Sequence, residues 1–243
     1  MDGKLNNRIS LITGAGKGIG RATALLFAKE GSSVYAVART STDLDSLVND
    51  ASGSEGRITP VPGDITDRGF VAELFEKVER ECGRLDILVN SAGFVAGGSI
   101  FKMDEDQFLE CLKVNVWATF LCTKHAAIVM KKNGSGKIIN LGSVRSHWTE
   151  SGSAGAYNAS KYAVKGFTES VARELHGSGT GISVGMVCPG VTDTPMTNPS
   201  GGPAPVHFMK AEVVADAILF AAANPENVNA YDITLFSTAQ KPW

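Results

Sequence analysis

The feature that most restricts the fold is a regular alternation of short apolar runs and longer amphipathic stretches along nearly the whole chain. Most of the runs lack a period of two, as expected for strands that are covered on both faces. They span Ile9–Thr13, Ser33–Ala38, Ile58–Val61, Leu85–Val89, Lys137–Leu141, Ile182–Cys188 and Asp232–Phe236. This alternation predicts an α/β fold, a doubly wound seven-stranded parallel sheet with helices on both faces.

Three of the amphipathic stretches have a recognisable end or face. Arg21–Glu30 stops at Gly31, a residue typical of helix C-termini, and Phe70–Glu81 follows Thr66 and Asp67, both suitable N-caps. Tyr157–His176 carries apolar residues at helical spacing. We therefore expect helices at these three places.

The 243 residues are expected to form a single domain, 1–243, because no linker, repeat or low-complexity tract interrupts the pattern. The one break in composition, Thr197–Pro205, is rich in glycine and proline and predicts a surface loop.

Charge and composition exclude several classes of function. A formal net charge of -2 gives no broad positive field for nucleic acid. No apolar run approaches the roughly 18 residues of a membrane span, and the first residues lack the apolar region of a secretory signal. The four cysteines include no C-x-x-C pair and are interpreted as reduced, packed thiols. We expect a cytoplasmic protein that binds neither nucleic acid nor membranes.

A glycine-rich loop joins the first apolar run to the first helical stretch. It is Thr13-Gly14-Ala15-Gly16-Lys17-Gly18-Ile19-Gly20. Glycines at such a turn let backbone N–H groups approach a pyrophosphate, and the helix N-terminus adds a positive dipole. The spacing is G-x-x-x-G-x-G rather than G-x-G-x-x-G, and a tight turn without a ligand is the alternative. We favour a Rossmann-type dinucleotide site.

The end of the second apolar run bears on which dinucleotide binds. A site that selects NAD places a carboxylate there for the ribose 2′-hydroxyl, whereas this chain has Ala38 and then Arg39. Lys17 in the glycine loop can approach the same space. Two cations without a carboxylate favour the 2′-phosphate of NADPH/NADP+. The alternative is that both are solvated surface cations.

Tyr157 and Lys161 form a Y-x-x-x-K element. On a helix the two positions share one face, so the phenol and the ammonium project into one site. A neighbouring ammonium lowers a tyrosine pKa, which makes the phenol a usable general acid or base. Ser143 follows the run Lys137–Leu141, at the carboxyl end where parallel sheets place ligands, and is a candidate to hydrogen-bond a carbonyl oxygen.

Together these motifs resemble those of the short-chain dehydrogenase/reductase family, in particular its NADPH-preferring, carbonyl-reductase-like members. The similarity runs from Leu5 to about Pro195. The motifs in family order are T-G-x-x-x-G-I-G at Thr13–Gly20, Asp64 after the third strand, N-x-A-G at Asn90–Gly93, Asn115, Ser143, Y-x-x-x-K and P-G-x-x-x-T at Pro189–Thr194.

The resemblance implies a catalytic tetrad of Asn115, Ser143, Tyr157 and Lys161. Tyr157 would donate the proton to a carbonyl oxygen that Ser143 orients, while nicotinamide supplies hydride. Lys161 would bind the nicotinamide ribose and lower the tyrosine pKa, and Asn115 would hold a water that links Lys161 to solvent. The implied cofactor-binding residues are Gly14, Gly16, Lys17, Gly18, Ile19, Gly20, Arg39, Thr40, Asp64, Ile65, Asn90, Ala92, Gly93, Tyr157, Lys161, Pro189, Gly190, Val191 and Thr194.

Three departures limit what the resemblance implies. Asn90-Ser91 replaces the usual Asn-Asn, in a segment expected to be mainly structural. Ser143 and Tyr157 lie one position further apart than in many relatives, which leaves Ser146 as a less favoured alternative serine. The C-terminal residues lack the family's frequent glycine-rich ending, so no contacts are inherited there.

We expect the segments that face the tetrad to determine substrate selectivity. One of them is a lid loop at about 194–208, and because this loop is short we expect a fairly open substrate pocket. The candidate pocket residues are Phe94, Val144, Arg145, His147, Trp148 and Met196. A solvated loop with one buried aromatic residue is the alternative for His147 and its neighbours. No metal site is expected, because no histidine–carboxylate spacing indicates one.

The apolar segment Phe108–Met130, with Trp117 and Phe120, exceeds what one sheet face needs to bury. It resembles the family's paired-helix interface, so a homodimer or homotetramer is expected, with core packing as the alternative.

The favoured function is NADPH-dependent, reversible reduction of a small ketone or aldehyde to an alcohol. A 3-oxoacyl-thioester reductase acting on carrier-bound chains ranks second, and a sugar or polyol reductase stays open. A non-catalytic NADPH-binding sensor is disfavoured, because such a protein could lose the tyrosine or the lysine, whereas the whole tetrad is present.

Overall fold

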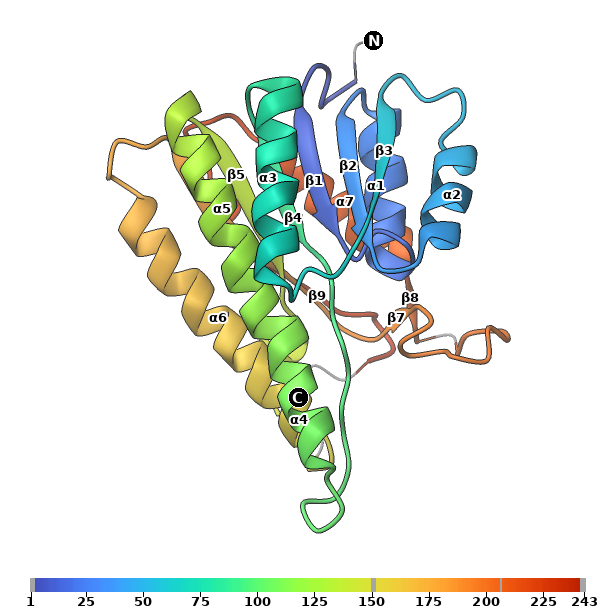
Figure 1. The fold of residues 1–243 in the computed structure, drawn as a ribbon. Coiled ribbons are helices and arrows are strands. Elements are labelled where there is room, and N and C mark those ends of the chain that lie inside the picture. Colours follow the sequence, from blue (N-terminus) through green and yellow to red (C-terminus); the bar gives the residue numbers. More distant parts are fainter. Residues whose placement is uncertain (1–2, 150–151, 206, 241–243) are drawn as a thin grey trace.

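A seven-stranded parallel sheet forms the centre of the computed structural model, which describes residues 3–149, 152–205 and 207–240 (Figure 1). The strand order is β3-β2-β1-β4-β5-β6-β9, so the direction of winding reverses between β1 and β4. The doubly wound sheet expected from the sequence is thus confirmed. The strands are β1 Ile9–Thr13, β2 Ser33–Ala38, β3 Arg57–Pro62, β4 Ile87–Asn90, β5 Gly136–Leu141, β6 Ile182–Pro189 and β9 Asp232–Leu235.

Helices cover both faces of the sheet, and each face has its own core. On one face Leu11, Leu88 and Ile138 pack beneath α3, α5 and α6. On the other face their chain neighbours Ile12, Val89 and Ile139 pack beneath α1, α2 and α7. Because successive strand residues are buried on opposite faces, the strands show no apolar–polar alternation. The helices are α1 Gly18–Lys29, α2 Ser41–Asp50, α3 Arg68–Cys82, α4 Glu105–Leu112, α5 Ala118–Asn133, α6 Gly155–Leu175 and α7 Ala211–Ala223.

The start of α3 and the end of α1 carry the capping residues expected from the sequence. The Asp67 side chain accepts a hydrogen bond from the Phe70 backbone N–H at 2.7 Å and so caps α3. Gly31 follows the end of α1 with a φ of +88°, a backbone conformation that favours glycine.

Several features differ from the sequence expectation or add to it. The stretch Phe108–Met130 is helical throughout, with a π-helical turn at Lys113–Trp117 between α4 and α5. The short parallel pair of β7 (Thr192–Asp193) and β8 (Met209–Lys210) was not expected from the sequence. The two strands lie on either side of the glycine- and proline-rich loop and join its ends.

In the part of the chain that the structure describes, no helix is long and apolar enough to cross a bilayer. All four cysteines are free thiols; Cys111, Cys122 and Cys188 are buried, and Cys82 is partly buried. The prediction of packed thiols is confirmed.

Candidate active site

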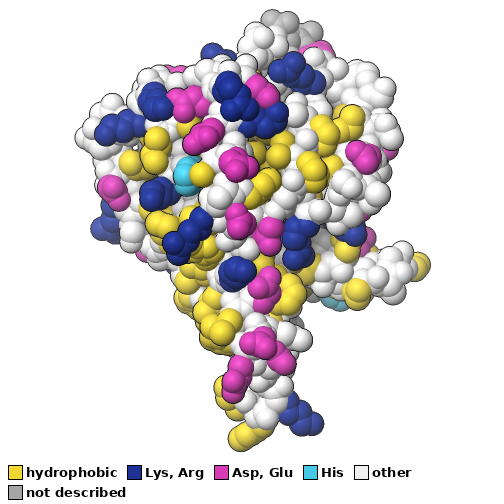
Figure 2. All heavy atoms as spheres, viewed as in Figure 1, with side chains coloured by type: hydrophobic (Ala, Val, Ile, Leu, Met, Phe, Trp, Pro, Cys, Tyr) yellow, Lys and Arg dark blue, Asp and Glu magenta, His cyan; other side chains and the backbone are white. Residues whose placement is uncertain are grey.

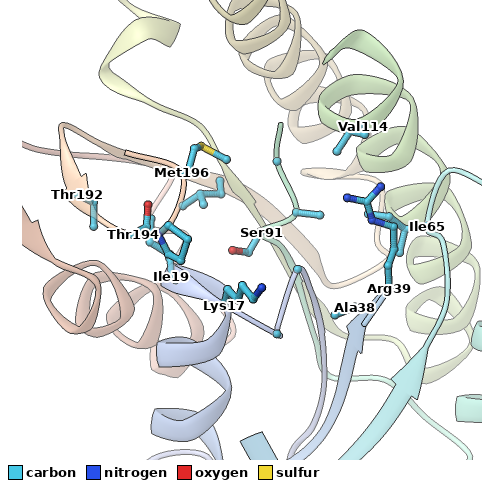
Figure 3. Close-up of a pocket in the computed structure, with 18 of the residues that line it drawn as sticks. Lys17, Ile19, Ala38, Arg39, Ile65, Ser91, Val114, Thr192, Thr194 and Met196 are labelled. Carbon is cyan, nitrogen blue, oxygen red and sulfur yellow. The ribbon is translucent and has the colours of Figure 1, made fainter. Parts of the chain in front are cut away.

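A cavity of about 380 Å³ lies at the carboxyl ends of the central strands, where the strand order reverses. In Figure 3, Arg39 and Ile65 lie toward one side of this cavity, and Thr194 and Met196 toward the other. A crevice at such a reversal is the usual ligand site of an open parallel sheet. All of the predicted cofactor-binding residues line it except Asn90 and Val191. Lining residues absent from the predicted set are Ala38, Asp43, Gly63, Thr66, Ser91, Val114, Leu141, Gly142, Thr192, Pro195 and Thr197.

The glycine loop is shaped by close approaches of the backbone. Gly14 has a φ of +67°, and a Cβ atom there would lie 2.7 Å from the Cα of Ala92. At Gly20 a Cβ atom would lie 2.3 Å from the carbonyl oxygen of Gly14. The N-cap of α1, Lys17, makes no side-chain capping bond, so the first N–H groups of this helix face the cavity without a cap. Such a turn fits a phosphate group.

Lys17 and Arg39 both line the cavity, as expected, but each has an acidic neighbour. The ammonium of Lys17 lies 3.3 Å from a carboxylate oxygen of Asp43, a residue that the sequence analysis did not single out. Burial alone would raise the pKa of Asp64, but hydrogen bonds from Thr66 and the charge of Arg39 hold it below its ordinary value. Asp43 follows Arg39 closely in the sequence, within the first turn of α2, and only this proximity could have drawn attention to it.

Asn90 and Val191 have other partners. The Asn90 amide is buried and donates to the hydroxyl of Thr123 at 3.1 Å and to the side-chain oxygen of Asn140 at 2.9 Å. It therefore ties β4 to α5 and β5, in agreement with a mainly structural segment. The backbone N–H of Val191 donates to Gln240 at 3.0 Å.

Ser143 and Tyr157 both line the cavity, and the Ser143 side chain acts on the phenol of Tyr157. Ser143 follows β5 directly, and its hydroxyl also accepts from the backbone N–H of Arg145 at 3.2 Å. The alternative serine, Ser146, is fully buried, and its hydroxyl accepts from the backbone N–H of Ser143 at 3.2 Å. The geometry therefore supports Ser143 as the serine that would meet a substrate.

The pKa of Tyr157 moves opposite to the expected direction. Burial raises it to about 12, and the groups that oppose this shift are the Ser143 hydrogen bond and the charge of Arg145. The ammonium of Lys161 lies 5.6 Å from the centre of the tyrosine ring. It is not among the principal groups that shift the phenol, so the expectation that Lys161 lowers the tyrosine pKa is corrected here.

Lys161 is itself strongly affected by its surroundings. Its side chain is 4% exposed, and its ammonium donates to the carbonyl oxygen of Leu141 at 2.7 Å. Burial lowers the pKa of Lys161 to about 8. Near neutral pH the site thus holds an amine whose pKa lies only slightly above the pH of the solution. Beside it lies a phenol that stays protonated.

Asn115 lies in the π-helical turn and is 1% exposed. Its side chain accepts from the backbone N–H of Phe94 at 2.7 Å and donates to the carbonyl oxygen of Phe94 and the hydroxyl of Ser160, both at 2.9 Å. It does not line the cavity. In this structure Asn115 holds the segment after β4 against the helix that carries Tyr157.

The predicted substrate residues separate into two groups. Met196 lines the cavity, whereas Phe94, Val144, Arg145, His147 and Trp148 do not. The imidazole of His147 lies 3.2 Å from a carboxylate oxygen of Asp232, and the ring of Trp148 packs on Phe236 at 5.7 Å. These two side chains therefore contact β9 and the residue after it rather than the cavity.

Replacing Lys161 by methionine is expected to stabilise the fold while it removes activity. The folded-state pKa of about 8 lies below the ordinary 10.5, so the charged amine destabilises the native state fully below pH 8 and less as pH rises toward 10.5. After allowance for the lost bond to Leu141, the free energy of unfolding at pH 7 should rise by about 2 kcal/mol. Urea unfolding at several pH values measures this, with exposed Lys29→Met as control. Equal stability of Lys161→Met and wild type at pH 7 would contradict the account.

Comparisons with known proteins agree with this geometry. The family model described as short chain dehydrogenase matches residues 8–202. A 3-oxoacyl-[acyl-carrier-protein] reductase FabG of Thermotoga maritima is 38% identical over 230 residues, covering 91% of this chain and 92% of the relative. An uncharacterized oxidoreductase of Staphylococcus aureus is 32% identical over 231 residues, covering 95% and 97%. The crystal structure of a short-chain type dehydrogenase/reductase from Mycobacterium marinum superposes with a TM-score of 0.88 at 28% identity, covering 97% of each chain.

Proposed function

The chain belongs to the short-chain dehydrogenase family of oxidoreductases, which act on CH–OH and C=O groups with a nicotinamide cofactor, and from this premise we propose that it is an NADPH-dependent carbonyl reductase. It reversibly reduces a small ketone or aldehyde to an alcohol, with Tyr157 as general acid and base. The observation that carries the proposal is that Ser143, Tyr157 and the buried Lys161 line the same cavity as Lys17 and Arg39.

The residues present fit the cofactor. The turn at Gly14 and Gly20 leaves no room for a Cβ atom, and the uncapped N-terminus of α1 offers backbone donors to a pyrophosphate. Lys17 and Arg39 would hold the 2′-phosphate, and Lys161 the nicotinamide ribose. When bound, the dihydronicotinamide supplies hydride to the carbonyl carbon.

The protein residues supply the proton and the orientation. Ser143 donates a hydrogen bond to the substrate oxygen and holds it near the phenol of Tyr157. Because burial keeps that phenol protonated near neutral pH, it can donate its proton to the oxygen as negative charge develops there. Lys161, fixed on the Leu141 carbonyl, would hold the nicotinamide ribose beside the ring of Tyr157.

A second candidate is a 3-oxoacyl-thioester reductase, favoured by the 38% identity to the Thermotoga maritima enzyme. An acidic carrier protein would need a basic surface beside the pocket. Arg145 and Lys210 are the basic residues that the sequence offers for this role, and Arg145 donates to the side chain of Asn158 at 3.2 Å. We therefore rank this activity second, with a sugar or polyol reductase as a further alternative.

The direct test follows oxidation of NADPH and of NADH separately with ketones, diketones, aldehydes, keto-sugars and 3-oxoacyl thioesters. Turnover with NADPH and a small ketone or aldehyde supports the proposal. A strong preference for 3-oxoacyl thioesters would replace it by the second candidate. Tight NADPH binding without turnover of any carbonyl would instead favour a non-catalytic binding protein.

We also propose that the protein is a homodimer or homotetramer formed through α4, α5 and α6. Figure 2 shows hydrophobic side chains gathered on the lower flank of the molecule, over these helices. Exposed residues there include Leu109, Phe120, Ile128 and Tyr162. Although Phe120 stacks on Trp117 at 5.5 Å, 37% of it stays exposed, which an interface would cover.

The change Phe120→Glu is therefore expected to shift the protein to a monomer, because a carboxylate would be buried in the interface. Light scattering coupled to size-exclusion chromatography measures the mass. Val213→Glu, at an exposed position of α7, is the matched change on another face. A wild-type monomer, or dissociation by Val213→Glu alone, would contradict the assignment of the interface.

Two wider expectations are kept as proposals. Residues 1–243 act as one domain, and the protein works in the cytoplasm, where its four free thiols would stay reduced.

A further inference from the structure

Behind the catalytic serine, three side chains with metal-binding atoms converge from different parts of the chain. His147 comes from the turn after β5, Cys188 from the end of β6, and Asp232 from the start of β9. One ligand atom of each lies within 4.8 Å of those of the other two. None of the three lines the cavity, and the proposed reaction uses none of them.

Two of these side chains already stand at the separation that a shared ion requires. The Nε2 atom of His147 lies 3.2 Å from an Oδ atom of Asp232. Two zinc bonds of about 2.05 Å at the tetrahedral angle place their ligand atoms about 3.4 Å apart. The His147 side chain is 14% exposed and that of Asp232 is 25% exposed, so the pair is largely shielded and still within reach of solvent.

The third side chain is a buried thiol whose sulfur lies within 4.8 Å of the ligand atoms of the other two. Cys188 is fully buried, and burial raises the pKa of its thiol to about 12, against the smaller opposing effects of Ser143 and Ser146. A metal ion bound to the sulfur would displace the thiol proton, because a coordinating thiol is deprotonated. Gly142 makes room for this arrangement, since a Cβ atom there would lie 2.6 Å from the Cys188 sulfur.

We propose that His147, Cys188 and Asp232 bind a zinc ion, with water in the fourth position. Thiolate, imidazole and carboxylate are ligands that Zn²⁺ accepts in tetrahedral sites, whereas magnesium and calcium prefer oxygen alone. The charges of the thiolate and the carboxylate balance those of the ion, so the loaded site is neutral, as a shielded position requires.

Binding moves protons in a defined way. The Lys165 ammonium lies 3.0 Å from Nδ1 of His147 and can only donate, so without the ion Nδ1 accepts and Nε2 carries the proton. Nε2 is buried and has no hydrogen-bond partner among the described residues, although it lies 3.2 Å from a carboxylate oxygen of Asp232. When Nε2 binds zinc, that proton moves to Nδ1. The Cys188 thiol loses its proton to solvent, so one proton is released for each zinc bound.

Lys165 therefore competes with the ion and must turn away from the imidazole. Glu169 is one helical turn further along α6, with a carboxylate oxygen 4.0 Å from the ammonium, and can receive it. It follows that Lys165→Met should bind zinc more tightly than wild type. The ion would also tie the turn after β5, which carries His147 and follows Ser143, to β6 and β9.

The test is metal binding by full-length protein that has been dialysed against a chelator and then titrated with Zn²⁺ or Co²⁺. We expect about one ion per chain and, with Co²⁺, the visible bands of a tetrahedral site plus a near-ultraviolet sulfur-to-cobalt band. Asp232→Asn should weaken Zn²⁺ binding at least about 10-fold. Cys188→Ala should remove the sulfur-to-cobalt band, while Lys165→Met should keep it and lower the dissociation constant. The matched controls Cys82→Ala and His125→Gln should change nothing.

The proposal is overturned if micromolar Zn²⁺ and Co²⁺ do not bind, or if Cys188→Ala and Cys82→Ala give the same spectrum and affinity. Circular dichroism of each variant separates loss of the site from loss of the fold. These readouts do not depend on turnover, so failure here leaves the proposed reductase activity untouched, and the reverse also holds.

Discussion

Replacement of Tyr157 by phenylalanine is expected to lower kcat/KM for carbonyl reduction by about 10³- to 10⁴-fold, the upper range for loss of a positioned general acid. The change removes only the phenolic oxygen from a side chain that lines the cavity together with Ser143. NADPH affinity should change less than about 3-fold, because the proposed phosphate contacts lie at Lys17 and Arg39. Steady-state rates and a fluorescence titration with NADPH measure the two quantities.

Tyr231→Phe is the matched control, since it deletes the same oxygen from a partly exposed tyrosine before β9 that does not line the cavity. Its kcat/KM should stay near that of wild type. If Tyr157→Phe retains more than about a tenth of wild-type kcat/KM, the assignment of Tyr157 as general acid is wrong.

Replacement of Arg39 by aspartate is expected to reverse the cofactor preference. It removes a charge-assisted contact to the 2′-phosphate, worth about 1.5–3 kcal/mol, and adds repulsion, so kcat/KM with NADPH should fall about 10²- to 10³-fold. Activity with NADH, which lacks that phosphate, should stay level or rise. Arg39 is chosen over Lys17 because Asp43 already offsets the charge of Lys17 at 3.3 Å.

The control for this experiment is Arg57→Asp, the same change of charge at an exposed position that starts β3, at the opposite end of the sheet from the cavity. Its ratio of NADPH to NADH activity should match wild type. An Arg39→Asp variant that keeps the wild-type ratio would show that Arg39 is a solvated surface cation.

The sheet was largely predictable because its strands are buried on both faces and bounded by polar or glycine-rich segments. Two strands have the predicted bounds, Ile9–Thr13 and Ser33–Ala38. In each of them burial changes sharply at an end of the apolar run, so the bounds are visible in the sequence. Helix α2 gave a weaker signal, because only Leu44 and Leu47 are fully buried along it. The pair β7 and β8 depends on contacts across a loop and leaves no local pattern.

The site was predictable where it depends on motifs and not where it depends on distant contacts. One cavity collects all of the motif residues. The glycine loop and Ser143 reach it because each follows the end of a strand, and Tyr157 and Lys161 reach it because they share one face of a helix. His147 and Trp148 turn toward Asp232 and Phe236, residues far along the chain, which no spacing rule could indicate. The direction of the Tyr157 pKa shift depends on burial by the whole fold, whereas the i, i+4 spacing indicates only which charge lies nearby.

The central claim, hydride transfer from NADPH to a carbonyl carbon in this cavity, is tested most directly with NADPH deuterated at both C4 positions. The substrate is the best carbonyl compound found in the panel, and the alcohol product is examined by mass spectrometry and NMR. We predict one deuterium on the carbinol carbon for each NADPH consumed, and none above background in Tyr157→Phe over the same time. An alcohol without deuterium, or NADPH that binds and is never consumed with any carbonyl, would contradict the account.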